Sequence, residues 1–320
     1  MPGSTLENKL IAVMGATGLQ GGAVVDALLA AGHAASNIRA ITRNPTGAKA
    51  AALADKGIQV VQGDADDEAS MVKAFENAYG AFLVTNFWAD MSMAHEMAQT
   101  KTLQNAVLAA NVTHVILSTL EDTRPIIHAA ADKDTWTVLE KALGSYVPHF
   151  DGKGAASKEF LASAAPTTLL YTSFYYDNFI NFGMGPKKHA EDQPAAITFP
   201  TGAGAIPMCS VPDIGRKVVS ILNNPETINT EQGVVGAFHT GQEIADLFSK
   251  SLGTPVVFNA VEVAAYAAFG FPGAADLANM FRFMVSFKPT HRDVASTQKC
   301  LDGKLDTLEE WIETNKAAFQ

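Results

Sequence analysis

The segment Leu10-Ile-Ala-Val-Met-Gly15-Ala-Thr-Gly18-Leu-Gln-Gly21-Gly22 decides the fold. It begins with an apolar run of strand length and continues with glycines at every third position. Such a turn needs a residue that tolerates positive φ, a bare backbone beside a pyrophosphate, and a small residue where helix and strand pack. The helix that follows presents its first N–H groups to the phosphates. Because the pattern stands between a strand and a helix, it predicts dinucleotide binding rather than a purely structural turn.

Short apolar runs alternate with helix-period segments over the first half of the chain. Strands are predicted at Leu10–Met14, Ile38–Thr42, Ile58–Gln62, Ala81–Thr85, Val115–Ser118 and Thr167–Thr172. Helices are predicted at Gly18–Ala31, Gly47–Lys56, Glu68–Ala78, Met91–Ala110 and Lys153–Ala164. This alternation predicts an α/β fold: a Rossmann-type, doubly wound parallel sheet with helices on both faces.

The alternation stops in two places, and these set the expected domain organisation. Residues 121–148 have no clear period, and residues 186–207 are punctuated by proline and glycine, so both are expected to be irregular. Capping-box patterns at Thr240-Gly-Gln-Glu243 and Thr307-Leu-Glu-Glu310 predict helices after them. We expect a dinucleotide-binding domain over residues 1–185. A smaller, mostly helical C-terminal lobe is expected over 186–320, with segments returning to the main sheet.

The composition narrows the class of protein. Of 320 residues, 48% are apolar and 18% charged, which argues against a disordered chain. A net charge of −10 without a basic run argues against direct nucleic-acid binding. Cys209 and Cys300 form no CxxC or zinc-ligand spacing, and no metal site is expected. Without an apolar signal core or a membrane-length apolar run, a cytoplasmic protein is expected. Whether the protein enters the nucleus and whether it forms a homodimer are left open.

The end of the second strand indicates which dinucleotide binds. Sites for NAD usually carry an acidic residue about 20 positions after the glycines, for the ribose 2′-OH. This chain has Arg43 there, followed by Lys49. A guanidinium can grip a 2′-phosphate, so NADP(H) is favoured over NAD(H), although a solvated arginine is the alternative. Asp64, after the third strand, is a candidate for the adenine amino group, while its neighbours Asp66 and Asp67 suit helix capping.

Other candidates follow the later strands. Asn86, Phe87 and Trp88 come after the fourth strand, where ribose or nicotinamide contacts are expected in such sheets. Ser118, with its neighbour Thr119, ends the fifth strand, where related folds place a hydroxyl near the substrate carbonyl. Phe174, after the sixth, is a candidate for the nicotinamide face. For each of these, strand termination or core packing remains the alternative.

The expected catalytic pair is incomplete. Short-chain dehydrogenase-like folds use a tyrosine acid and a lysine four residues apart on one helix face. The matching place here reads His149-Phe-Asp-Gly-Lys153. Lys153 is a candidate for the cofactor ribose, with an exposed lysine as the alternative. His149 is either an acid or a polar residue at a helix start.

Together these motifs resemble the NmrA-like family of atypical short-chain dehydrogenase relatives, in particular its NADPH-sensing members. The resemblance rests on the glycine turn and seven further stretches. These are Thr42-Arg-Asn-Pro, Val61-Gln-Gly-Asp-Ala-Asp-Asp, Val84-Thr-Asn-Phe-Trp, Ser118-Thr-Leu-Glu, His149-Phe-Asp-Gly-Lys-Gly, Phe199-Pro-Thr-Gly and Phe271-Pro-Gly-Ala-Ala-Asp-Leu-Ala-Asn-Met-Phe-Arg-Phe. The resemblance implies NADP(H) as cofactor, loss of the tyrosine acid and a cleft beside a C-terminal lobe. Phosphate contacts are implied for Gly15, Thr17, Gly18, Gln20 and Gly21, and Leu19 lies among them.

The resemblance implies two functions. Some members of the family are redox sensors or co-regulators that act through protein partners, and others are reductases of quinones or dyes. The first hypothesis is a regulator whose partner binding depends on the bound dinucleotide. The alternative is an NADPH-dependent reductase of a small carbonyl, quinone or conjugated substrate, with Lys153, His149 and Ser118 as candidate catalytic residues. The sequence leaves both open.

Overall fold

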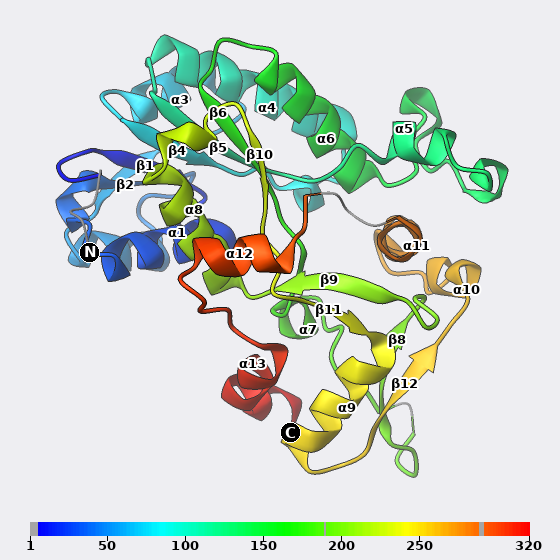
Figure 1. The fold of residues 1–320 in the computed structure, drawn as a ribbon. Helices are drawn as coiled ribbons and strands as arrows, with labels where there is room; N and C mark the ends of the chain where they lie inside the picture. Colours follow the sequence, from blue (N-terminus) through cyan, green and yellow to red (C-terminus); the bar gives the residue numbers. More distant parts are fainter. Residues whose placement is uncertain (1–5, 189, 288–290) are drawn as a thin grey trace. The chain divides into compact units, whose positions relative to one another are not determined.

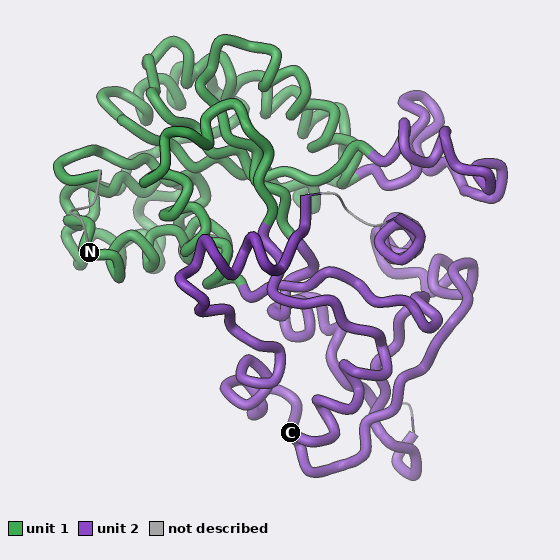
Figure 2. The backbone as a smooth tube through the Cα atoms, in the orientation of Figure 1, with its two compact units in different colours: residues 1–122, 149–172, 211–233 green, residues 123–148, 173–210, 234–320 purple. Residues whose placement is uncertain are grey.

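The computed structural model describes residues 6–188, 190–287 and 291–320, and it divides into two compact units (Figure 2). Unit 1 is built from residues up to 122, 149–172 and 211–233. Unit 2 is built from residues 123–148, 173–210 and 234–320. Each unit therefore combines three separate segments of the chain. Residue 185 lies inside unit 2, and residues 211–233 return to unit 1.

A seven-stranded sheet forms the centre of unit 1 (Figure 1). Its strands lie in the order β10 (Glu231–Gly233), β6 (Thr167–Tyr171), β5 (His114–Thr119), β4 (Gly80–Leu83), β1 (Ile11–Met14), β2 (Ile38–Thr42) and β3 (Gln59–Gln62). All neighbouring strands are parallel. The order reverses between β1 and β4, which is the place where open α/β sheets bind ligands. The predicted Rossmann-type, doubly wound parallel sheet is confirmed.

Helices cover both faces of this sheet (Figure 1). One face carries α3 (Glu68–Phe75), α4 (Met93–Ala109) and α6 (Pro148–Leu161), whose buried apolar side chains pack on the strands. The other carries α1 (Leu19–Ala30) and α8 (Val211–Leu222), while α2 (Ala48–Asp55) connects β2 and β3. A Cβ at Gly215 of α8 would lie 2.1 Å from the carbonyl oxygen of Ala23 in α1. Glycine at this position therefore sets how closely the two helices pack.

Unit 2 contains two small sheets and several short helices. One sheet has the order β11 (Ala237–Thr240), β9 (Ala205–Cys209), β7 (Phe174–Tyr175), and in the other β12 (Val256–Ala260) pairs with β8 (Ala195–Phe199). Its helices include α5 (Thr123–His128), α7 (Asn178–Asn181), α9 (Gly241–Leu252), α10 (Val263–Ala267), α11 (Ala274–Ser286), α12 (Val294–Cys300) and α13 (Leu308–Asn315). Thr240 and Thr307 form the predicted capping boxes at the starts of α9 and α13.

Two expectations from the sequence were wrong. Residues 186–207 contain β8 and the start of β9, so this segment is not irregular, whereas residues 121–148 consist mostly of turns around the short helix α5. The strands form because they pair with β12 and β11, far along the chain, and such pairing overrides local proline and glycine signals. In addition, α6 begins at Pro148 rather than at Lys153. Proline suits the first helical position, where no N–H is needed.

Candidate functional site

The glycine turn between β1 and α1 has the geometry that its sequence predicts. Gly15 has φ +64°, and its carbonyl oxygen accepts a hydrogen bond of 2.8 Å from the N–H of Gly18. A Cβ at Gly21 would lie 2.4 Å from the same oxygen, so only glycine lets α1 pack this close to the turn. Within the described residues, no side chain caps α1, and its first turn has no acidic residue. The start of α1 is therefore arranged to receive an anion.

Side chains from other elements reach this turn. Lys49 Nζ, in α2, donates to the carbonyl oxygen of Thr17 at 3.4 Å. Ser118 Oγ, in β5, donates to Oε1 of Gln20 at 2.7 Å. Leu19 is an apolar side chain that is 42% exposed at the start of α1. The structure thus brings Lys49 and Ser118 to the glycine turn, and Ser118 does so through Gln20.

Arg43 follows β2 directly and is exposed. Its positive charge acts on Asp66, in the turn after β3. Hydrogen bonds from His95 and Gln99 are the main causes that lower the pKa of the Asp66 carboxyl, and the charges of His95 and Arg43 lower it further. The exposed guanidinium is therefore within electrostatic range of the acidic turn beside it.

The acidic turn after β3 divides its roles among neighbouring residues. Oδ1 of Asp64 accepts a hydrogen bond of 3.2 Å from the N–H of Asp66. Asp67 is the N-cap of α3 and accepts from the N–H of Ser70 at 3.2 Å. Capping thus falls to Asp67, one of the two residues that the sequence offered for this role. The adenine contact of Asp64 stays a prediction.

The residues after β4 include an aromatic cluster around His149. Asn86 is exposed, Phe87 is buried and Trp88 is half-buried. His149, in the first turn of α6, is 6% exposed, with its ring centroid 4.9 Å from that of Trp88 and 6.0 Å from that of Phe87. The ring centroid of Phe150 lies 4.8 Å from that of His149. The position of the expected acid is therefore packed among aromatic rings.

Lys153 is engaged by the protein. Its Nζ donates to the carbonyl oxygen of Thr85 at 3.1 Å, to Thr85 Oγ1 at 2.9 Å and to Glu96 Oε1 at 2.5 Å. Thr85 Oγ1 donates in turn to Glu96 Oε1 at 2.7 Å. The side chain of Lys153 is 14% exposed and that of Glu96 is 2% exposed. Lys153 is therefore not the exposed lysine of the alternative interpretation.

Sequence reasoning did not single out Glu96 or the role of Thr85. A signal was nevertheless present. Glu96 lies on the face of α4 that also carries Met93, Thr100 and Leu103, all of which are buried. A carboxylate at helical spacing among buried positions indicates a paired, buried charge.

Phe174 lies in β7 of unit 2, whereas the other candidates lie in unit 1. It is buried, and its ring lies 5.9–6.0 Å from the rings of Phe179, Phe199 and Phe281. Phe174 is thus part of the aromatic core of unit 2, and its contact with nicotinamide stays a prediction.

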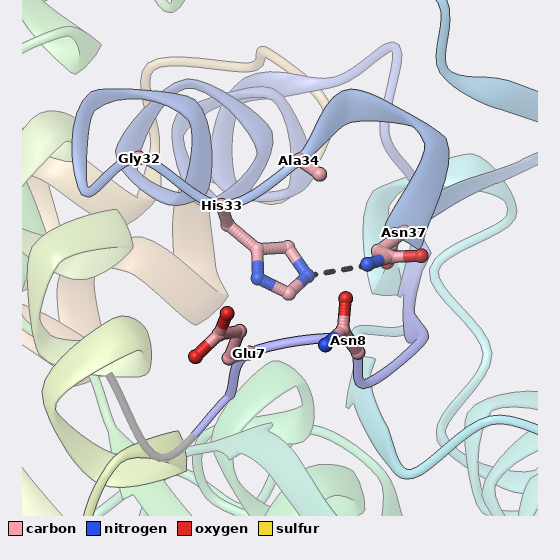
Figure 3. Close-up of a pocket in the computed structure, with 6 residues that line it drawn as sticks. All are labelled: Glu7, Asn8, Gly32, His33, Ala34 and Asn37. Atoms are coloured by element: carbon pink, nitrogen blue, oxygen red, sulfur yellow. Dashed lines mark hydrogen bonds between the residues drawn. The ribbon is translucent and has the colours of Figure 1, made fainter. Parts of the chain in front are cut away.

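A pocket of about 370 Å³ lies away from the glycine turn. It lies beside the amino ends of β1 and β2 and is lined by Glu7, Asn8, Gly32, His33, Ala34 and Asn37 (Figure 3). In the described part of the chain, no group of three or more His, Cys, Asp or Glu side chains is placed to hold a metal ion. No helix of the described residues is long and apolar enough to cross a membrane.

Comparison with known proteins identifies relatives over nearly the whole chain. The model of the NmrA-like family matches residues 7–312. The NmrA-like family domain-containing oxidoreductase FrzB of a Cladobotryum species is 27% identical over 295 residues, covering 86% of this chain and 83% of that protein. The corresponding oxidoreductase notA′ of Aspergillus versicolor is 39% identical over 137 residues, and the match spans only 38% of its length.

Solved structures share the fold. The triphenylmethane reductase of a Citrobacter species, complexed with NADP(H), has a TM-score of 0.75 and 24% identity over 95% of this chain and 99% of its own. Nmra, a negative transcriptional regulator in complex with NAD, has a TM-score of 0.75 and 18% identity over 96% of this chain and 95% of its own. At these identities, the likeness establishes the fold alone.

Proposed function

Because the chain belongs to the NmrA-like family, we propose that it binds NADP(H) at the glycine turn. The observation that carries this proposal is the close packing at Gly21, where any side chain would collide with the Gly15 carbonyl. The residues fit the cofactor: its phosphates would face the N–H groups at the start of α1, beside Thr17, Leu19 and Gln20. When bound, the cofactor supplies or accepts a hydride.

The end of β2 supports NADP(H) over NAD(H). No Asp or Glu occurs from Thr42 to Lys49, so no carboxylate there repels a 2′-phosphate. Arg43 is exposed, and the ammonium of Lys49 already reaches the turn. We assign the 2′-phosphate to Arg43, with Lys49 as a second positive charge. Asp64 and Asn86 stay candidates for the adenine and nicotinamide halves, respectively.

We further propose that the protein is a redox sensor that binds a partner protein according to the dinucleotide it holds. The support is that the candidate proton donors are engaged. The hydroxyl of Ser118 donates to Gln20, the ammonium of Lys153 donates to Thr85 and Glu96, and His149 packs among aromatic rings. Such a site holds a dinucleotide without a dedicated acid. A cytoplasmic location with access to the nucleus, and a homodimer, stay predictions.

The alternative, an NADPH-dependent reductase, is favoured by the names of relatives such as FrzB and triphenylmethane reductase. A hydride transferred to a quinone or conjugated substrate gives a delocalised anion, which water can protonate. Half-buried Trp88 beside Asn86 offers an apolar surface for a flat substrate of this kind.

Calorimetric titration with NADPH, NADP⁺, NADH and NAD⁺ tests the proposal. NADPH and NADP⁺, which carry the 2′-phosphate, are expected to bind at least tenfold more tightly than NADH and NAD⁺. A sensor is also expected to prefer either the reduced or the oxidised form. A parallel assay follows NADPH oxidation with a panel of quinones. Turnover above background would favour the reductase, and absence of binding by all four dinucleotides would contradict the proposal as a whole.

A further inference from the structure

A largely buried trio of polar residues, two of them charged, joins three parts of unit 1. Lys153 comes from α6, Glu96 from the first turn of α4, and Thr85 from the segment after β4. A lysine ammonium has three N–H donors. Here three acceptors, the carbonyl and hydroxyl oxygens of Thr85 and Oε1 of Glu96, lie within 3.1 Å of Nζ. The donors of Lys153 are therefore fully used by this trio.

The local packing fits this arrangement. A Cβ at Gly152 would lie 3.1 Å from Cγ of Met93 and 3.3 Å from Oε2 of Glu96. The absence of a side chain at Gly152 thus gives the carboxylate its room between α4 and α6. Within the described residues, Oε2 of Glu96 has no hydrogen-bond partner, so the carboxylate is bound through Oε1 alone.

Stability alone does not account for such a trio. Burying two charges costs solvation, and apolar side chains of similar volume are often as stable or more stable. An unpartnered buried oxygen adds a further cost. Residues that break such local rules are expected at functional sites. The trio lies at the end of β4, next to exposed Asn86, where parallel sheets bind ligands.

We propose that Glu96 is a positioning residue for the nicotinamide half of the dinucleotide site. Its carboxylate holds the ammonium of Lys153 against Thr85 and thereby fixes the backbone that leads into Asn86. The inference rests on the proposed function, because it assigns part of the same site. It also changes the expected role of Lys153. The sequence assigned this lysine a direct contact with the cofactor ribose, whereas in this inference it acts by holding Thr85.

Two ligands of different length test this assignment. NADPH occupies both halves of a dinucleotide site, whereas adenosine 2′,5′-bisphosphate occupies only the adenine half. In calorimetric titrations, Glu96→Gln is expected to weaken NADPH binding at least tenfold and to change binding of the bisphosphate by less than twofold. Lys153→Met should show the same selective loss of NADPH affinity. The double variant should bind NADPH no more weakly than Lys153→Met, because Glu96 acts through Lys153.

Glu159→Gln is the matched control, since Glu159 is exposed on α6 and should leave both affinities unchanged. If Glu96→Gln does not fold, Thr85→Val removes only the hydroxyl of the trio and should also weaken NADPH selectively. Equal weakening of both ligands, or no change in either, would overturn the inference. A wild-type protein that binds neither ligand would instead refute the proposed function.

Discussion

Nε2 of His95 lies 2.7 Å from Oδ1 of Asp66, and Nδ1 of the same ring contacts Oδ2 of Asp90. Hydrogen bonds with Asp66 and Asp90 raise the pKa of His95. Hydrogen bonds with His95 are also the leading cause that lowers the pKa of each carboxyl. A protonated His95 therefore connects the turn after β3, the loop after β4 and the start of α4.

This connection predicts how stability depends on pH. Because the pKa of His95 is raised by folding, its stabilisation is complete below the unfolded pKa of about 6.5 and is lost as pH rises through the folded value. Folding lowers the pKa values of Asp66 and Asp90. The stabilisation by these two carboxylates is therefore present above their unfolded pKa and is lost as pH falls through their folded pKa. In urea unfolding from pH 5.5 to 9, the unfolding free energy of the wild type should fall at alkaline pH. His95→Gln should lack the part of this fall that the contacts of His95 with Asp66 and Asp90 cause.

His33→Gln serves as the control for this measurement, because the His33 ring contacts the backbone carbonyl of Asn37 and lies beside the amino ends of β1 and β2, away from His95. Its pH profile should match the wild type. The difference for His95 should shrink at 1 M salt, since the three side chains are exposed and screened. Identical profiles for wild type and His95→Gln would contradict the prediction.

Adjacent glycines in α1 should respond in opposite directions to alanine. At Gly21 the added Cβ collides with the backbone of Gly15, whereas at Gly22 its nearest atom is 3.5 Å away, an ordinary contact. Gly21→Ala is expected to cost about 2 kcal/mol or more in unfolding free energy and to abolish NADPH binding. Gly22→Ala should stabilise by up to about 1 kcal/mol, because alanine is the better helix former. Urea unfolding of both variants decides the matter, and equal effects would argue against the close packing.

Arg43→Glu should weaken NADPH binding much more than NADH binding. A charge-assisted hydrogen bond contributes about 1.5–3 kcal/mol, which corresponds to roughly a 10- to 150-fold loss for NADPH. NADH lacks the 2′-phosphate and should lose less than about threefold. Lys56→Glu is the control with the same change of charge, since Lys56 is exposed and pairs with Asp26 on the surface. Equal losses for both dinucleotides would remove the 2′-phosphate from Arg43.

His149 should act by packing rather than as an acid. His149→Phe keeps a flat ring among Phe87, Trp88 and Phe150, so NADPH affinity and any quinone-dependent NADPH oxidation should stay within about twofold of wild type. His149→Ala should lower the unfolding free energy by about 2 kcal/mol, because it leaves a cavity. A stable His149→Phe protein with activity reduced more than about tenfold would restore the acid role.

The sequence carried the Rossmann sheet because its signals are local. Six of its seven strands fall in short runs that the sequence predicts, whereas β10, Glu231–Gly233, is polar and was not predicted. Gly15, Gly18 and Gly21 are spaced for one turn, and the structure confirms the positive φ of Gly15 and the close contact at Gly21. The NmrA-like family followed from motifs spread along the chain. These features need only neighbouring residues to be recognised, which is why the sequence sufficed for them.

The remaining features depend on contacts between distant residues. β8 becomes a strand by pairing with β12, and Lys153 forms a half-buried ion pair because Glu96, 57 positions earlier, is folded against it. The sequence singled out Lys153 as a candidate residue but gave no partner for it. Periodicity does not report such partners, because it describes one element at a time.

The close contact between Gly215 and Ala23 has a consequence for how the protein is made. One flank of α1 packs against α8, and residues 31–210 separate the two helices along the chain. At a synthesis rate of about 5–20 residues per second, the ribosome needs roughly 10 to 40 s to supply that cover. During this interval we expect the flank of α1 that packs against α8 to stay uncovered, because unit 1 is complete only once residues 211–233 have been synthesised.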